Sequence, residues 1–106
     1  MTDYLIGSGN VFKDLGLPNP DERLAKAKLA WKINHSVAEK GMTQKEAADF
    51  LGIGRSKMTE LRNGRLKGFT IDVLFSLLGK LDHHIDIRVS PKEDFKAEDT
   101  IRVAFV

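Results

Sequence analysis

The chain of 106 residues contains no cysteine, which excludes disulfide bonds and thiolate metal sites and is compatible with the reducing cytoplasm, where we expect the protein to act. No window approaches the roughly 18 consecutive apolar residues of a membrane-spanning helix. The first ten residues, MTDYLIGSGN, lack the basic region and apolar run of a secretory signal. The length of 106 residues fits one domain, and a hydrophobic content of 42% suffices for one small core.

Signs of catalysis or metal binding are also scarce. The only histidines are His35, His83 and His84, and no two of them have the i, i+4 ligand spacing that, with a carboxylate, marks a zinc site. The glycine pairs 7/9 and 52/54 lack the third glycine or the GKS/T ending of a phosphate loop, and no serine has the setting of a nucleophile elbow. We therefore expect no enzymatic activity, no cofactor and no metal.

Charge is present but unevenly distributed. The net charge is +2, made up of −3 in residues 1–22, +6 in residues 23–82 and −1 in residues 83–106. Within the middle block, residues 55–67 carry five basic side chains and one acid. Basic runs are often merely solvated, but a local positive patch of this kind is also what phosphate binding requires.

Residues 42–63, MTQKEAADFLGIGRSKMTELRN, are the most informative stretch. Thr43 and Glu46 have the spacing of a capping box, which predicts the start of a helix. Gly52 stands where that helix must end, because glycine adopts the left-handed conformation without a Cβ penalty. A second helix follows and ends at Asn63-Gly64. Its apolar residues Met58 and Leu61 fall on one face, and the opposite face is left with Arg55, Ser56, Thr59 and Asn63.

Two short helices joined by a glycine turn resemble the helix-turn-helix of the Xre/Cro-like repressor family. The resemblance rests on seven positions at fixed spacing, namely Gln44, Ala48, Gly52, Ile53, Met58, Leu61 and Asn63. An ordinary helical hairpin with a glycine turn is the alternative, but it would not require Ala48 or a basic outer face. The resemblance implies a mainly α, four- to five-helix lambda-repressor-like domain whose second helix enters the major groove of DNA.

The DNA contacts follow from this comparison and from side-chain chemistry. Arg55, Ser56 and Thr59 are the candidate base-reading residues, because arginine bonds guanine bidentately and hydroxyls bond either base type. Gln44 resembles the family glutamine that contacts the DNA backbone and braces the second helix. The candidate phosphate contacts, which set register rather than sequence, are Thr43, Lys57, Arg62, Asn63, Arg65 and Lys67.

We expect the helix-turn-helix to lie in a domain of residues 21–82. A long helix from about Pro20 to Lys40 presents the core stripe of Leu29, Ile33 and Val37. Trp31 and Leu24 lie off this stripe; core packing is expected for Trp31 alone, and the alternative is that both receive the N-terminal arm or a second subunit. A further helix, capped by Thr70, closes the core with Ile71, Leu74, Phe75, Leu78 and Leu81.

The two ends of the chain have different patterns. Residues 1–20 form an irregular but apolar arm, in which VFKDLGL predicts one helical turn closed by Gly16. Residues 83–106 form a strand extension, because apolar residues alternate at 85, 87 and 89 and again at 101, 103 and 105. Two strands are marginal alone, so we expect a hairpin on the domain or pairing across a dimer.

Partners follow from the resemblance and from the size of the site. One reading helix addresses few base pairs, so we expect a homodimer on a palindromic operator. The leader GSGNVFKDLGLPNPDERLAKA resembles that of antitoxins paired with host-inhibition-of-growth or RelE-like toxins. The chain is thus expected to be a transcriptional repressor, either free-standing or an autoregulatory antitoxin; the alternative is a protein–protein module that mainly neutralises a toxin. Phe50 falls at a helix position that often faces solvent, and it is expected either to pack under the arm or to contact a partner protein.

Overall fold

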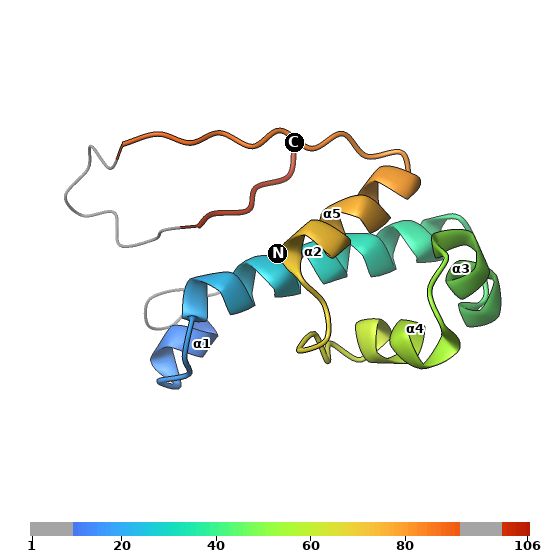
Figure 1. The fold of residues 1–106 in the computed structure, drawn as a ribbon, viewed down its shortest axis with the longest axis horizontal. Coiled ribbons are helices and arrows are strands. Elements are labelled where there is room, and N and C mark those ends of the chain that lie inside the picture. Colours follow the sequence, from blue (N-terminus) through green and yellow to red (C-terminus); the bar gives the residue numbers. More distant parts are fainter. Residues whose placement is uncertain (1–9, 92–100) are drawn as a thin grey trace. The chain divides into compact units, whose positions relative to one another are not determined.

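The computed structural model describes residues 10–91 and 101–106. Its helices are α1 (Val11–Asp14), α2 (Pro20–Glu39), α3 (Gln44–Leu51), α4 (Arg55–Arg62) and α5 (Ile71–Lys80), shown in Figure 1. Residues 26–86 form one compact unit, while residues 10–25, 87–91 and 101–106 belong to another. The mainly α helix-turn-helix fold predicted from the sequence is confirmed.

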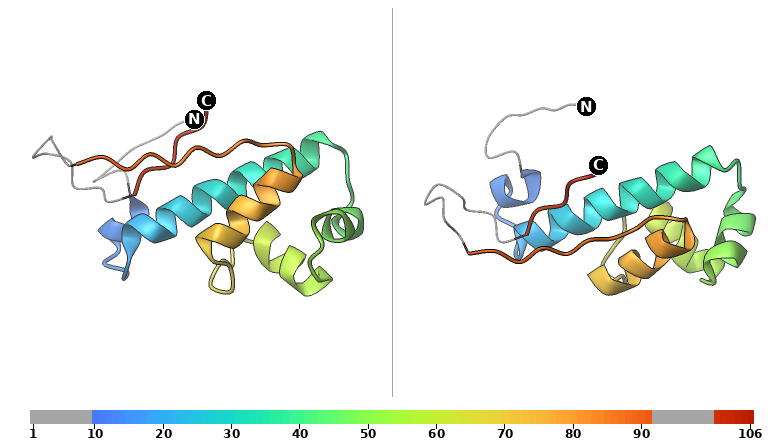
Figure 2. Two further views of the ribbon diagram at one scale, coloured as in Figure 1. Left: turned by 45° about the horizontal axis from the view of Figure 1, so that its top comes forward. Right: turned by 90° about the horizontal axis from the view of Figure 1, so that it is seen from above.

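The unit of residues 26–86 is built around an apolar core. Leu29, Ile33 and Val37 of α2 are buried at 4%, 0% and 8% exposure, so the predicted stripe is confirmed. In Figures 1 and 2, α5 lies beside the C-terminal half of α2; α3 lies at the C-terminal end of α2, and α4 follows below this half of the helix in Figure 1. These three helices complete the core with Ala47, Ala48, Leu51, Met58, Leu61, Leu74, Leu77, Leu78 and Leu81. Each of α3 and α4 thus packs one face on the core and leaves the other face exposed to solvent.

Two details of the predicted core were wrong. Ile71 and Phe75 are only half-buried, and Leu77 takes part in the core instead. Trp31 is 56% exposed, because its position on α2 turns it away from the stripe of Leu29 and Ile33. Its ring stacks on that of His35, with centroids 5.0 Å apart and planes 7° from parallel.

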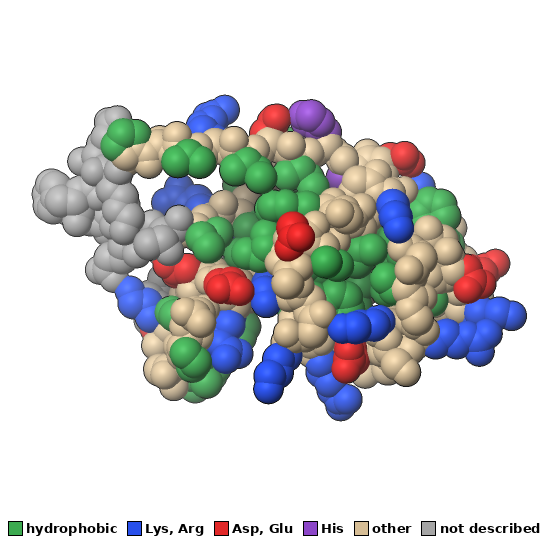
Figure 3. All heavy atoms as spheres, viewed as in Figure 1, with side chains coloured by type: hydrophobic (Ala, Val, Ile, Leu, Met, Phe, Trp, Pro, Cys, Tyr) green, Lys and Arg blue, Asp and Glu red, His purple; other side chains and the backbone are tan. Residues whose placement is uncertain are grey.

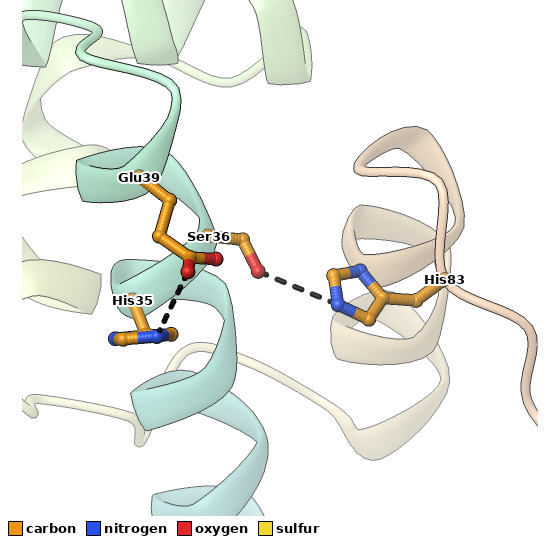
Figure 4. A network of polar contacts seen from close by, with 4 residues as sticks. All are labelled: His35, Ser36, Glu39 and His83. Atoms are coloured by element: carbon orange, nitrogen blue, oxygen red, sulfur yellow. Dashed lines mark hydrogen bonds and ion pairs between the residues drawn. The ribbon is translucent and has the colours of Figure 1, made fainter. Parts of the chain in front are cut away.

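A polar contact joins α2 to His83, three residues after the end of α5. The Ser36 hydroxyl lies 3.5 Å from Nε2 of His83, as Figure 4 shows. Ser36 is buried, and Nδ1 of His83 is buried without a hydrogen-bond partner in the described part of the chain. On the outer side of α2, His35 Nε2 lies 3.4 Å from the Glu39 carboxylate. This part-buried contact links the segment after α5 to α2.

The second unit contains the predicted helical turn, now seen as α1. The Asn10 side-chain oxygen accepts hydrogen bonds from the backbone N–H groups of Phe12 and Lys13, at 3.0 and 3.3 Å. Its side-chain nitrogen donates to the Pro20 carbonyl, 3.1 Å away, and to Asp21. One buried asparagine therefore caps α1 and ties it to the first turn of α2, where proline needs no hydrogen-bond acceptor for its nitrogen.

The predicted strands are not present among the described residues. Residues 84–91 and 101–106 carry neither strand nor helix, and Figure 2 shows both as plain coil. Ile87 and Val89, expected on a buried face, are 70% and 91% exposed, while Ile85 is half-buried. An extended segment becomes a strand only when its backbone groups pair with a neighbour, and no such ladder occurs in the residues described. The alternation in the sequence is therefore not matched by strand pairing within residues 10–91 and 101–106.

In the described ranges, no helix is both long and apolar enough to span a lipid bilayer.

Candidate nucleic-acid interface

The N-terminal end of α3 is fixed by the predicted capping box. The Thr43 hydroxyl accepts from the Glu46 N–H at 3.1 Å, and the Thr43 N–H donates to the Glu46 carboxylate at 2.8 Å. Two hydrogen bonds with Thr43 hold the pKa of the Glu46 carboxyl below its ordinary value. The bond from the Thr43 N–H has the larger effect, and the bond with the Thr43 hydroxyl has the smaller one. Thr43 and Gln44 are thereby held at the exposed end of the helix.

The turn between α3 and α4 has the geometry that its glycine predicts. Gly52 lies in the left-handed region, with φ 72° and ψ 30°, and the N–H of Ile53 bonds the Ala48 carbonyl at 3.0 Å. The Lys80 ammonium of α5 donates to the Leu51 carbonyl at 2.8 Å. A Cβ on Gly52 would stand 3.2 Å from that ammonium. The positive φ and the close lysine both favour glycine at this turn.

The exposed face of α4 is the predicted one. Arg55, Ser56 and Thr59 are exposed, while Met58 and Leu61 are buried. The N-cap residue, Gly54, is extended and provides no side-chain hydrogen bond. The first turn of α4 therefore combines the positive end of the helix dipole with backbone N–H groups that no side chain caps.

A polar network braces α4 against α3. The Gln44 side-chain nitrogen donates to the Thr59 hydroxyl, and the Thr59 hydroxyl donates to the Arg55 carbonyl at 3.0 Å. Arg62 donates to the Gln44 side-chain oxygen at 3.5 Å. This is the bracing arrangement that the family resemblance implies for Gln44. Thr59 takes part in the brace, whereas the side chains of Arg55 and Ser56 lie outside this network.

The far end of α4 leads into the α4–α5 loop, residues 63–70. Gly64 has φ 74°, and the Arg65 N–H bonds the Glu60 carbonyl at 2.8 Å. Asn34 of α2 donates to the Leu61 carbonyl at 3.2 Å and so satisfies one of the last acceptors of α4. The loop therefore leaves α4 in a defined direction, with Arg65 and Lys67 exposed on it.

The ten predicted site residues gather at the start of α3, on α4 and on the α4–α5 loop. All are exposed except Gln44, which is half-buried. Lys and Arg side chains line the lower border of this α3–α4 region in Figure 3. One residue is placed differently from expectation: the Lys57 ammonium turns to the Gly68 carbonyl, 2.9 Å away, rather than standing free.

Three positioning residues were not predicted from the sequence. Asn34 and Lys80 bond carbonyls that are 27 and 29 residues away along the chain, and Phe69, between α4 and α5, is 2% exposed. No local pattern marks such contacts. Only the apolar character of Phe69 between Gly68 and the Thr70 cap gave a signal, and it pointed to burial rather than to a role.

These features define a helix-turn-helix protein with a basic reading face. A family model described as a helix-turn-helix domain matches residues 11–90. A solved structure assigned to the XRE family of transcriptional regulators is similar to the chain at 34% identity and a TM-score of 0.77, covering 84% of this chain and 100% of the other. No curated protein sequence matches the chain. The chain belongs to the XRE family of helix-turn-helix, DNA-binding transcriptional regulators.

Proposed function

We propose that this protein is a cytoplasmic repressor that binds a palindromic operator as a homodimer, by recognition alone and without catalysis or cofactor. The observation that carries the proposal is the first turn of α4. Arg55 and Ser56 are exposed there on a helix with no side-chain cap, and Gln44 braces the same helix from α3. A braced helix whose N-terminal turn is open is suited to enter the major groove.

Base reading is assigned to the first turn of α4. Arg55 bonds guanine bidentately, and the Ser56 hydroxyl bonds either base type. The phosphate backbone is held by groups that flank this turn, which fix register without reading sequence. They are Thr43 at the start of α3, Arg62 and Asn63 at the end of α4, and Arg65 and Lys67 on the α4–α5 loop.

The homodimer follows from the small footprint of one reading helix. Two reading helices related by a two-fold axis address half-sites about 34 Å apart, and two-fold symmetry is the commonest closed arrangement of soluble oligomers. Ile87 and Val89 supply exposed apolar side chains on an extended segment. Pairing of this segment with its copy in a second subunit would complete the strand that the sequence pattern predicts.

The test selects DNA from a random pool with the full-length chain and measures binding together with sedimentation. We expect an inverted repeat whose full site binds more tightly than one half-site, and a chain that sediments as a dimer at tens of micromolar. Ile87→Asp should weaken the dimer without lowering the free energy of unfolding of the subunit, because Ile87 is exposed. Ser90→Asp adds the same charge three residues away and is the matched control, which should leave the dimer intact. A monomer that binds full and half-sites equally would refute the dimer.

The exposed apolar ends also favour a second candidate, neutralisation of a RelE-like toxin. In this antitoxin role the residues outside the reading face contact the toxin, while Arg55 represses the operon. Coexpression with a RelE-like ribonuclease encoded beside this chain tests it. Rescue of growth that survives Arg55→Ala and is lost in Ile87→Asp supports toxin neutralisation, and a toxin that stays active beside the wild-type chain refutes it.

A further inference from the structure

Lys57 has two contacts that no phosphate ligand requires. Its ammonium donates to the Gly68 carbonyl at 2.9 Å and lies 4.9 Å from the centroid of the Phe69 ring. Lys57 stands on α4, and both partners stand at the end of the α4–α5 loop. The side chain thus connects the reading helix to the loop across 11 residues of sequence.

The rest of the loop explains why this connection matters. Its start is fixed by the Arg65 N–H, which bonds the Glu60 carbonyl, and its end by Phe69, which is buried and bonds the Leu66 carbonyl through its N–H at 3.0 Å. Lys67 lies between these fixed points and is exposed. Lys57 contacts Gly68, the residue directly after Lys67. This contact therefore fixes the distance between Lys67 and α4.

Gly68 adds an independent observation. A Cβ at this position would stand 2.5 Å from the Lys57 ammonium. Its φ is not positive, so the backbone itself does not demand glycine there. The space that a side chain would occupy is the space that the ammonium uses. Lys57 and Gly68 therefore form a matched pair, in which the absent side chain admits the cation.

We propose that Lys57 is a positioning residue rather than a phosphate contact. Its ammonium clips the α4–α5 loop to the reading helix and thereby fixes the spacing between Arg55, which reads a base, and Arg65 and Lys67, which hold phosphates. This inference rests on the proposed DNA-binding surface. It predicts that the phosphate contacts of the loop lose strength when the clip is broken, even when every charge is kept.

The variant Gly68→Ala makes that distinction, because it displaces the ammonium and removes no charge. We expect Gly68→Ala to weaken operator binding, and Lys57→Met to weaken it as well. The double variant should lose less than the product of the two factors, by at least about twofold, since both break one contact. Lys45→Met removes the same charge from the exposed face of α3 and should show no such coupling to Gly68→Ala.

A second cycle tests the role of the loop cation. Lys67→Ala should lower operator affinity less in the Lys57→Met background than in the wild type. A direct Lys57–phosphate contact predicts the opposite pattern: losses that multiply, a slope of log affinity against log salt about one unit lower in Lys57→Met, and an unchanged or higher affinity in Gly68→Ala. Any of these three results would overturn the positioning role.

The free protein gives a readout that does not need DNA. The ε-methylene protons of Lys57 should be shifted upfield by the Phe69 ring in the NMR spectrum, and the shift should disappear in Gly68→Ala. A wild-type chain without this shift has no clip, and the inference fails. If the shift is present but the chain binds no DNA, the proposed function fails while the clip itself stands. Circular dichroism of both variants checks that the helices remain folded.

Discussion

The two helices of the reading motif, α3 and α4, are equal in length and differ in how their ends are stabilised. The start of α3 is capped by its own neighbours, through the reciprocal bonds of Thr43 and Glu46. The start of α4 has Gly54 and no side-chain cap. Support for α4 comes instead from elsewhere in the fold, from Asn34 on α2 and Gln44 on α3.

Under the proposed function, this difference separates a supporting helix, α3, from the helix that reads DNA, α4. A capping box satisfies the N–H groups of the first turn, so α3 needs no ligand at that end. In α4 the same groups stay without a side-chain acceptor, at the positive end of the helix, beside Arg55 and Ser56. Stabilising α4 from its sides and its C-terminus leaves its first turn without a side-chain cap, as the proposed contact with DNA requires.

The largest expected effect shows where the two helices are alike. Leu51 of α3 and Leu61 of α4 are both 0% exposed, so Leu51→Ala and Leu61→Ala should each lower the free energy of unfolding by about 2–5 kcal/mol. Urea denaturation measures the losses, with exposed Lys45→Ala as a control that should stay within about 0.5 kcal/mol. A much smaller loss for Leu61→Ala would mean that α4 is not part of the cooperative core.

The second effect shows where they differ. Arg55→Ala should cost about 1–3 kcal/mol of binding to the operator and relax the preference at one base pair. Lys45→Ala removes a charge from the first turn of α3 and should cost less, by an equal amount on every sequence. Fluorescence anisotropy with the operator and with random DNA measures both variants. An Arg55→Ala loss that is equal on both DNAs would mean that Arg55 holds a phosphate rather than reads a base.

The division between local and distant support also explains what the sequence could predict. The capping box of Thr43 and Glu46 and the left-handed Gly52 depend on near neighbours, and the sequence located them correctly. The bonds of Asn34 and Lys80 to distant helix ends leave no local trace. The placement of the reading face was predictable, since it follows from which side of α4 is apolar. Its bracing was predictable only through the resemblance that singled out Gln44.

The absence of the predicted strand from the described residues has the same origin. Alternation at Ile85, Ile87 and Val89 describes a face that could be buried, but burial depends on a partner that the local pattern does not contain. The exposed Trp31 shows the reverse case, because residue type favoured the core while the helical phase of α2 pointed it outward. The type of a side chain and its periodicity are separate signals, and the periodicity was the more reliable one on this helix.

A smaller effect is expected from a substitution that gives α4 the side-chain cap that α3 has and α4 lacks. Gly54 has φ −69° and ψ 159°, and a Cβ there would meet no atom within 4 Å, so Gly54→Ser adds a cap without strain. Stability should rise by a few tenths of a kcal/mol, while operator affinity should fall, because the serine hydroxyl occupies N–H groups of the reading turn. Gly54→Ala, which fits but cannot cap, is the control. If Gly54→Ser raises both quantities, the open end has no role in binding.

The smallest effect is a pH dependence that α3 has and α4 lacks. Hydrogen bonds from Thr43 lower the pKa of the Glu46 carboxyl from its ordinary value of 4.5, and α4 carries no acid in its first turn. A carboxyl whose pKa is lower in the folded chain stabilises it above the unfolded pKa, and this contribution is lost as pH falls through the folded pKa.

Glu46→Gln keeps a side-chain oxygen for the Thr43 N–H and removes the titration. The difference in unfolding free energy between the wild type and Glu46→Gln should therefore be constant from about pH 7 to about pH 5.5 and shrink as the pH falls below about 4.5. Urea denaturation across this range measures it, and Asp49→Asn, at an exposed acid in the middle of α3, is the matched control. A difference that stays constant down to about pH 3 would show that the carboxylate charge adds nothing to the cap of α3. The two helices would then differ only in the presence of a hydrogen-bonding side chain at their starts.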